Sequence, residues 1–192
     1  MIHLMLAMAA LPPAARPGFS RVPGVVVAHR AGANGIYIGS PSLAILPDGG
    51  YVASHDEFGP DSGMETSGRT RVFRSADRGK SWRQGAEIDG QFHSRLFVHR
   101  GRLYLLGTNR VSGNVVIRRS ADGGGTWSTP SGPRAGLLHE GTGFRAAPTP
   151  VIEHAGRLWC AMERRDPPRE EAPNLACMLS VPADADLLDA AS

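Results

Sequence analysis

Ser75-Ala-Asp-Arg-Gly-Lys-Ser-Trp82 recurs 45 residues later as Ser120-Ala-Asp-Gly-Gly-Gly-Thr-Trp127. The shared residues suit a tight turn, because a Ser hydroxyl and an Asp carboxylate bond nearby backbone amides and Gly adopts positive φ. The Trp at the end can pack the turn back onto its own sheet. We therefore interpret the motif as structural, with these members: Ser75, Asp77, Gly79, Trp82, Ser120, Asp122, Gly124 and Trp127.

A second pattern frames the octapeptides. Residues 43–55, 96–107 and 151–162 each contain an apolar run, a Gly-containing turn and another apolar run, which predicts a β-hairpin. A further strand is expected before each octapeptide (70–74 and 114–119), and another is expected to start at Trp82 and at Trp127. The third unit reaches its third strand at 174–180 and has no octapeptide. A repeat of about 40–50 residues with four strands is typical of a β-propeller blade.

The octapeptides resemble the Asp-box, or BNR repeat, of the sialidase-like β-propellers. This resemblance implies an all-β fold whose complete form has six or seven four-stranded blades, of which this chain supplies about three to four. We expect a leader and linker at residues 1–22 and the N-terminal part of a propeller at residues 23–192. An incomplete ring leaves strand edges exposed, so we expect it to fold poorly alone unless it dimerises.

Charge and hydropathy narrow the choice of partners. The net charge is +3, and Lys80 is the single lysine. The arginines are spread along the chain, so a nucleic-acid-binding stripe is not expected. Their planar forks suit carboxylates and sulfates, so an acidic oligo- or polysaccharide is the expected partner, while a solvated surface role is the more ordinary alternative for these arginines. No apolar run approaches the about 20 residues of a membrane span.

The apolar N-terminal run and the two cysteines bear on the cellular compartment in which the protein works. Leu4–Leu11 is apolar and ends near a small-residue site, but no basic residue precedes it. It favours a secreted or periplasmic protein, with a cytoplasmic one as the alternative. Cys160 and Cys177 either form a cross-strand disulfide or remain two free thiols. No ligand spacing predicts a metal site, and no motif predicts a cofactor.

The octapeptides fix the polarity of each blade. In a four-stranded antiparallel blade, the first and third turns lie at one end and the longer connections at the other. Because functional residues concentrate on long loops of rigid scaffolds, the end opposite the Asp-boxes is the expected site. The substrate-binding candidates there are Arg30, Tyr37, Asp56, His93, Arg145 and Glu163.

A second resemblance supplies the catalytic candidates. Residues 29–42, 51–60, 103–108 and 156–163 are similar to seven-bladed propellers of the ulvan-lyase-like and α-L-rhamnosidase-like groups. That resemblance implies catalysis by histidines, with Tyr and Arg support in the lyases. The matching positions are His29, His55, Tyr104, Arg118 and Arg119. The sialidase Arg-Ile-Pro motif is absent, because its place reads Tyr37-Ile38-Gly39-Ser40-Pro41.

Together these features predict a carbohydrate-active enzyme that cleaves glycosidic bonds of an anionic glycan. Hydrolysis would use a carboxylate or His to activate water and another acid to protonate the leaving oxygen. Elimination would use a His or Tyr to remove the proton beside a uronate carboxylate that Arg neutralises. The alternatives are a non-catalytic propeller that binds glycans or proteins, and an inactive truncated fragment.

Overall fold

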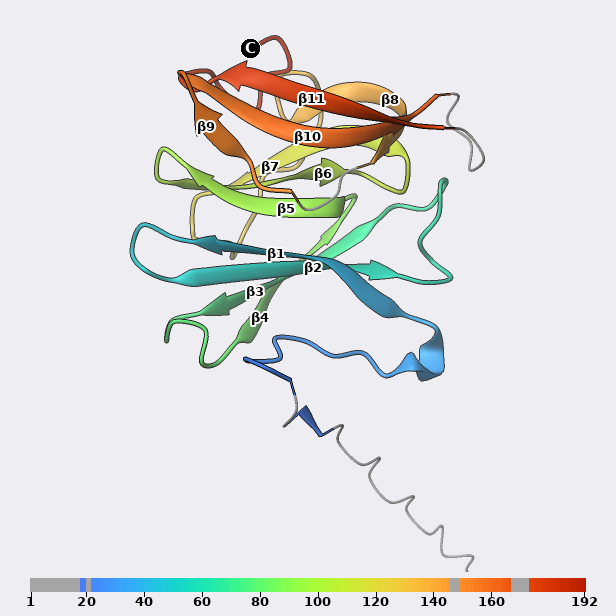
Figure 1. Cartoon of the computed structure of the whole chain (residues 1–192), viewed down its shortest axis with the longest axis vertical. Helices are drawn as coiled ribbons and strands as arrows, with labels where there is room; N and C mark the ends of the chain where they lie inside the picture. Colours follow the sequence, from blue (N-terminus) through green and yellow to red (C-terminus); the bar gives the residue numbers. More distant parts are fainter. Residues whose placement is uncertain (1–17, 20–21, 146–148, 167–172) are drawn as a thin grey trace, which may run out of the picture.

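The protein is a stack of antiparallel β-sheets (Figure 1). The computed structural model describes residues 18–19, 22–145, 149–166 and 173–192. Within that part of the chain the regular elements are eleven strands and a short 3-10 helix at Gly32–Asn34. No helix in the described ranges is long and apolar enough to cross a membrane. The predicted leader at 1–22 lies almost entirely outside the described residues.

Blades one and two have the predicted order of strands. Blade one consists of β1 (Tyr37–Ile45), β2 (Tyr51–Phe58), β3 (Arg69–Ser75) and β4 (Arg83–Asp89), paired in sequence order. Blade two consists of β5 (Phe92–His99), β6 (Arg102–Thr108), β7 (Gly113–Ser120) and β8 (Leu137–Arg145). Every neighbouring pair is antiparallel. The all-β propeller prediction is confirmed.

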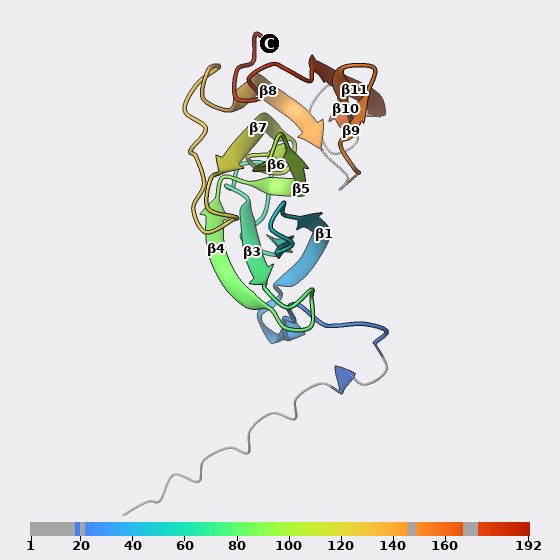
Figure 2. The ribbon, with the colours of Figure 1, turned by 90° about the vertical axis from the view of Figure 1, so that its left-hand side faces the viewer.

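Blade three contributes three strands. They are β9 (Ile152–His154), β10 (Arg157–Arg165) and β11 (Asn174–Pro182), with β10 between the other two. A short pairing of β10 with the end of β8 joins blade three to blade two. The blades lie one above another from β1–β4 to β9–β11, and the view from the side shows the same stacking (Figure 2).

Apolar side chains fill the space between successive blades. The contact between blades one and two contains Val52, Val72, Leu96 and Leu105. Tyr104, Ile117, Leu158 and Met162 belong to the contact between blades two and three. Successive side chains of a strand point to opposite faces of the blade, so each strand supplies side chains to both neighbouring blades. Each blade is therefore apolar on both faces.

Both octapeptides form the predicted turn. Gly79 and Gly124 have φ of 82° and 95°, and their amides donate to the hydroxyls of Ser75 and Ser120 over 2.8 Å. The carboxylate of Asp122 accepts hydrogen bonds from both the amide and the hydroxyl of Thr126. The indole of each Trp donates to the carbonyl of the glycine that both octapeptides share, from Trp82 to Gly79 at 3.0 Å and from Trp127 to Gly124 at 3.2 Å.

We expect Ser120→Ala to lower the free energy of unfolding by about 1 kcal/mol, since the buried amide of Gly124 loses its acceptor. Urea unfolding measures this loss. Ser131→Ala, which changes an exposed hydroxyl, is the control and should leave stability unchanged. Equal stability of the two variants would contradict the structural role of the motif.

One strand position was predicted wrongly. The fourth strand of blade two begins at Leu137 and not at Trp127. Pro130 and Pro133 lie in the intervening segment, where a proline cannot donate to a sheet. The chain rejoins β7 where the amide of Ile117 donates to the carbonyl of Gly136. The segment 130–149, which connects the second octapeptide to the third predicted hairpin, therefore contains β8.

The two cysteines are free thiols. In the β10–β11 register, Cys160 lies opposite Leu179 and Cys177 lies opposite Met162, so neither faces the other. The disulfide alternative is not supported.

Candidate functional site

The first strands of blades one and two each carry an irregularity at the same place. The register of β1 shifts between Gly39 and Ser42, and that of β5 shifts between Phe92 and Arg95. Within these bulges Ser40 and His93 both have φ of 49°. Positive φ costs energy for residues other than glycine, and such strain and bulges concentrate at functional sites. This end of the strands is the one predicted to bear function.

Asp56 lies beneath the two bulges and ties the blades together. Its side chain is fully buried, and it accepts hydrogen bonds from the Thr70 hydroxyl at 2.5 Å and the Ser94 amide at 2.9 Å. The Thr70 hydroxyl is also within 3.0 Å of the Ser94 hydroxyl. Burial raises the pKa of Asp56 to about 6, despite the lowering effect of these hydrogen bonds.

The second group of candidate residues is His93 and Arg145 of blade two and Glu163 of blade three. Pairing of β8 with β10 sets Glu163 directly opposite Arg145. Burial, together with the nearby charge of Arg145, lowers the pKa of His93 to about 4, so its ring is neutral at pH 7. The Nδ1 atom of His93 is buried without a hydrogen-bond partner among the described residues. Glu163 itself is exposed to solvent.

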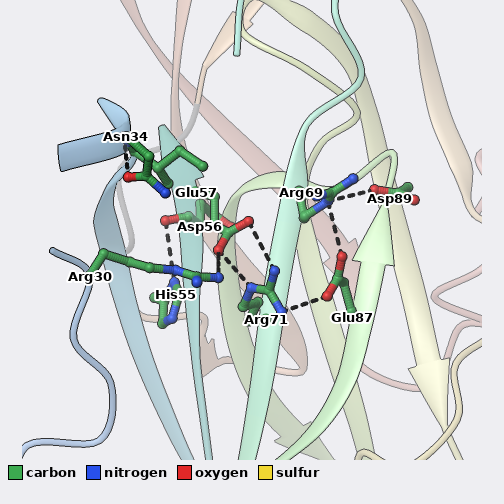
Figure 3. A network of polar contacts seen from close by, with 10 residues as sticks. Arg30, Asn34, His55, Asp56, Glu57, Arg69, Arg71, Glu87 and Asp89 are labelled. Carbon is green, nitrogen blue, oxygen red and sulfur yellow. Dashed lines mark hydrogen bonds and ion pairs between the residues drawn. The ribbon is translucent and has the colours of Figure 1, made fainter. Parts of the chain in front are cut away.

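Glu57 is the centre of an ion-pair network at the same end of blade one (Figure 3). Arg30 and Arg71 both bond its carboxylate, the latter from Nε at 2.6 Å. Arg71 also contacts Glu87 at 2.5 Å, and Arg69 joins Glu87 to Asp89. Burial acts to raise the pKa of Glu57, but the hydrogen bonds from Arg71 and Arg30 outweigh it and lower the pKa.

A cavity of about 480 Å³, lined by both polar and apolar side chains, adjoins this network. Glu57, Asp61, Arg69 and Asp89 line it, together with residues of the 59–67 loop. Carboxylates and a guanidinium in one hollow can bind hydroxyl-rich molecules by donating and accepting hydrogen bonds. Arg71 and Thr70 were not among the predicted residues, because they lie within an ordinary alternating strand that gives no local signal.

Three of the predicted catalytic residues are structural in their contacts. Tyr104 is 5% exposed and stacks on Phe97 in the core between blades two and three. Arg118 is buried and donates to the carbonyls of Asp89, Gly90 and Ser128, so it holds the connection between blades one and two. Arg119 neighbours the second Asp-box turn, at the opposite end of the blade. These positions do not support catalytic roles.

The two predicted catalytic histidines differ in their position: His29 precedes β1, whereas His55 lies in β2 opposite the bulge of β1. His29 is exposed and packs edge-on against Phe19. His55 is buried, packs against Phe73 with the two rings tilted by 30°, and contacts the Asp56 carbonyl through Nδ1 at 3.3 Å. Burial lowers the pKa of His55. Among the binding candidates, Arg30 is engaged by Glu57, and Tyr37 is exposed while its ring stacks on Phe58.

The described residues contain no cluster of three or more His, Cys, Asp or Glu side chains suited to a metal ion. The site as described is built from one neutral histidine, several carboxylates and several arginines. Such groups can carry protons and bind anions.

The stacked blades show the β-propeller fold, and the two octapeptide turns resemble the Asp-box turns of sialidase-like propellers. No family model and no curated protein matches the chain. Solved structures do match it. The α-L-arabinofuranosidase of Fusarium graminearum in complex with arabinobiose aligns with a TM-score of 0.55 and 11% identity, over 76% of this chain and 45% of that one.

Two other glycosidases align similarly. A family 117 glycoside hydrolase of Zobellia galactanivorans has a TM-score of 0.53 and 15% identity, over 87% of this chain and 57% of that one. The xylan β-1,4-xylosidase of Bacillus halodurans has a TM-score of 0.55 and 13% identity, over 78% and 29%. The chain thus spans less than two thirds of each of these structures. At such identities the likeness shows the shared propeller fold.

Proposed function

We propose that the chain belongs to a glycoside hydrolase of the propeller fold that acts on an anionic glycan. The observation that supports this best is that His93 lies within the electrostatic influence of Arg145, whose partner in the paired strands is Glu163, at the end of the blades predicted to bear function. The structural neighbours that hydrolyse glycosides support the reaction class. Export, which the N-terminal run favours, would bring such an enzyme to polymeric glycans.

Each of the three residues has a distinct role in this proposal. Arg145 binds the carboxylate or sulfate of the sugar. Glu163 donates its proton to the glycosidic oxygen as the bond to the anomeric carbon breaks, and water adds to that carbon. His93 is neutral at pH 7, so its ring can accept the proton of the attacking water.

A uronate lyase is the second candidate. A neutral histidine beside an arginine suits removal of the proton next to a carboxylate, because the arginine stabilises the charge that develops there. In that reaction the leaving oxygen is protonated, a double bond forms in the sugar, and no water is consumed.

Incubation with a panel of glycans tests the proposal. The panel contains arabino- and xylo-oligosaccharides, sialosides, and carboxylated and sulfated polysaccharides, and products are identified by mass. Each cut should add one water, and acidic substrates should react best. Unsaturated products without added water would identify a lyase. Binding without conversion would favour a glycan-binding propeller, and preferential cleavage of neutral substrates would contradict the role of Arg145.

A further inference from the structure

The face of blade three that points away from blade two is apolar and open. Ile152, Trp159 and Met178 are 56%, 41% and 69% exposed. Trp159 pairs with Ile152 across β9–β10, while Met178 pairs with Ala161 across β10–β11, so all four share one side of the sheet. We call these four residues the blade-three face. Apolar side chains gathered this way on one surface mark a contact with another surface.

The same positions of the preceding blade form an established contact. The hairpins of blades two and three share the residues His-x-Gly-Arg-Leu at 99–103 and 154–158, which aligns Ile152 with Phe97 and Trp159 with Tyr104. Phe97 and Tyr104 are cross-strand partners, as Ile152 and Trp159 are, and they pack between blades two and three. The blade-three face therefore has the sequence and register of a surface that receives a following blade.

Blade one presents the complementary kind of surface at the other end of the stack. Leu43 pairs with Ala53, and Ile45 with Tyr51, on the side away from blade two. Leu43 and Ile45 are each 55% exposed. We call these four residues the blade-one face. Residues 25–28 lie along part of it, where they line a hollow of about 550 Å³ with Leu43 and Tyr51.

The equivalent pairs of blade two are buried, except that Val98 is partly buried. Leu96 pairs with Leu105, and Val98 with Leu103, and all four pack against blade one. A surface like the blade-one face thus packs against the preceding blade. The described stack has the blade-one face at one end and the blade-three face at the other. These two faces correspond to the two sides of the contact between successive blades, which occurs twice within the chain.

We propose that two copies of this chain associate through these faces to close a ring of six blades. The blade-three face of each copy packs on the blade-one face of the other, so a twofold axis relates two identical contacts. Six blades fall within the four to eight of closed propellers. Closure also removes both open ends, which otherwise favour aggregation.

The six-bladed ring would bring the candidate-site residues of both copies around one opening, at the end of the blades opposite the Asp-box turns. Within one chain, β2, which carries Glu57, and β10, which carries Glu163, belong to the first and the last blade of the stack (Figure 1). In the ring each copy's blade three adjoins the other copy's blade one. A glycan bound at this opening would then meet carboxylates and arginines from both copies.

Sedimentation equilibrium of the whole chain across a wide range of concentration tests the ring. We expect a species of twice the 20.4-kDa chain mass, with no larger species. Met178→Glu on the blade-three face and Leu43→Glu on the blade-one face should each give the single-chain mass. Ala76→Glu, at an exposed position of the first Asp-box turn, is the control and should remain dimeric.

A mixture of the two charged variants is a sharper test. One of the two contacts in the mixed pair joins unaltered faces, so the mixture should regain association that neither variant shows alone. Tryptophan fluorescence gives a readout without an added charge. Dilution of the unaltered protein should shift its emission to longer wavelength, because Trp159 becomes exposed to solvent when the dimer dissociates. Trp159→Phe should remove that shift.

The possible results distinguish a second copy of this chain from other partners of the two faces. A folded single chain at every concentration would overturn the proposal and assign the faces to further blades or another protein. Chains of growing length would show that the contact does not close. A dimer that only one of the two charged variants disrupts would show a different interface. None of these results depends on glycan cleavage.

Discussion

The free energy of unfolding should fall by about 3 kcal/mol between about pH 4 and pH 7 through Asp56 alone. Its carboxyl has a pKa of about 6 in the folded protein and an ordinary value of 3.8. The folded state therefore holds this proton more tightly, and stability is lost as pH rises through that window. The size follows from about 1.4 kcal/mol for each pKa unit.

Asp56→Asn provides the comparison, because it cannot ionise. Its amide can still donate to the Thr70 hydroxyl and accept from the Ser94 amide, so the links between blades are kept. Urea unfolding of both proteins at several pH values gives the difference, in which all other titrating groups cancel. A difference that does not change with pH would show that Asp56 ionises in an ordinary environment.

Asp56→Ala separates the hydrogen bonds from the charge. At about pH 4, where the carboxyl is neutral in the folded state, this variant should be less stable than Asp56→Asn by about 1–3 kcal/mol, since the buried Ser94 amide loses its acceptor.

The fold could be predicted from the sequence because its signals are local. Each Asp-box turn is closed by its own residues, and each hairpin is an alternating run around a glycine turn. The one strand that was predicted at the wrong place is the fourth strand of blade two. Residues 128–136 interrupt blade two, and their position depends on distant contacts, such as the bond from the Gly136 amide to the Leu188 carbonyl. No pattern within the segment itself reports such a contact.

The site was harder to predict because polar residue types do not reveal which way a side chain points. Arg118 and Arg119 differ by one position, yet one is fixed to the connection between blades and the other lies near a turn. Tyr104 has the residue type of a proton carrier and the surroundings of a core residue. His93, Arg145 and Glu163 were predicted only as binding residues, and the bulge that gives His93 its position is not visible in sequence.

Glu163→Gln should reduce turnover of the best glycan by about a hundredfold to ten-thousandfold, the usual contribution of a general acid or base. Gln keeps the shape of the side chain and its place opposite Arg145, so binding of the substrate should change little. The expected pattern is a fall in kcat with a nearly constant KM, measured by product formation at varied substrate concentration.

Glu153→Gln is the matched control, because Glu153 is an exposed carboxylate of the same blade at the turn end of β9. It should keep full turnover. Glu57 is the alternative candidate for the catalytic carboxylate, since it lines the cavity of blade one. Its pKa is already lowered by two arginines. A carboxylate held ionised in this way suits a base or nucleophile better than an acid. Loss of turnover in Glu57→Gln together with full turnover in Glu163→Gln would therefore move the catalytic centre from blade three to blade one.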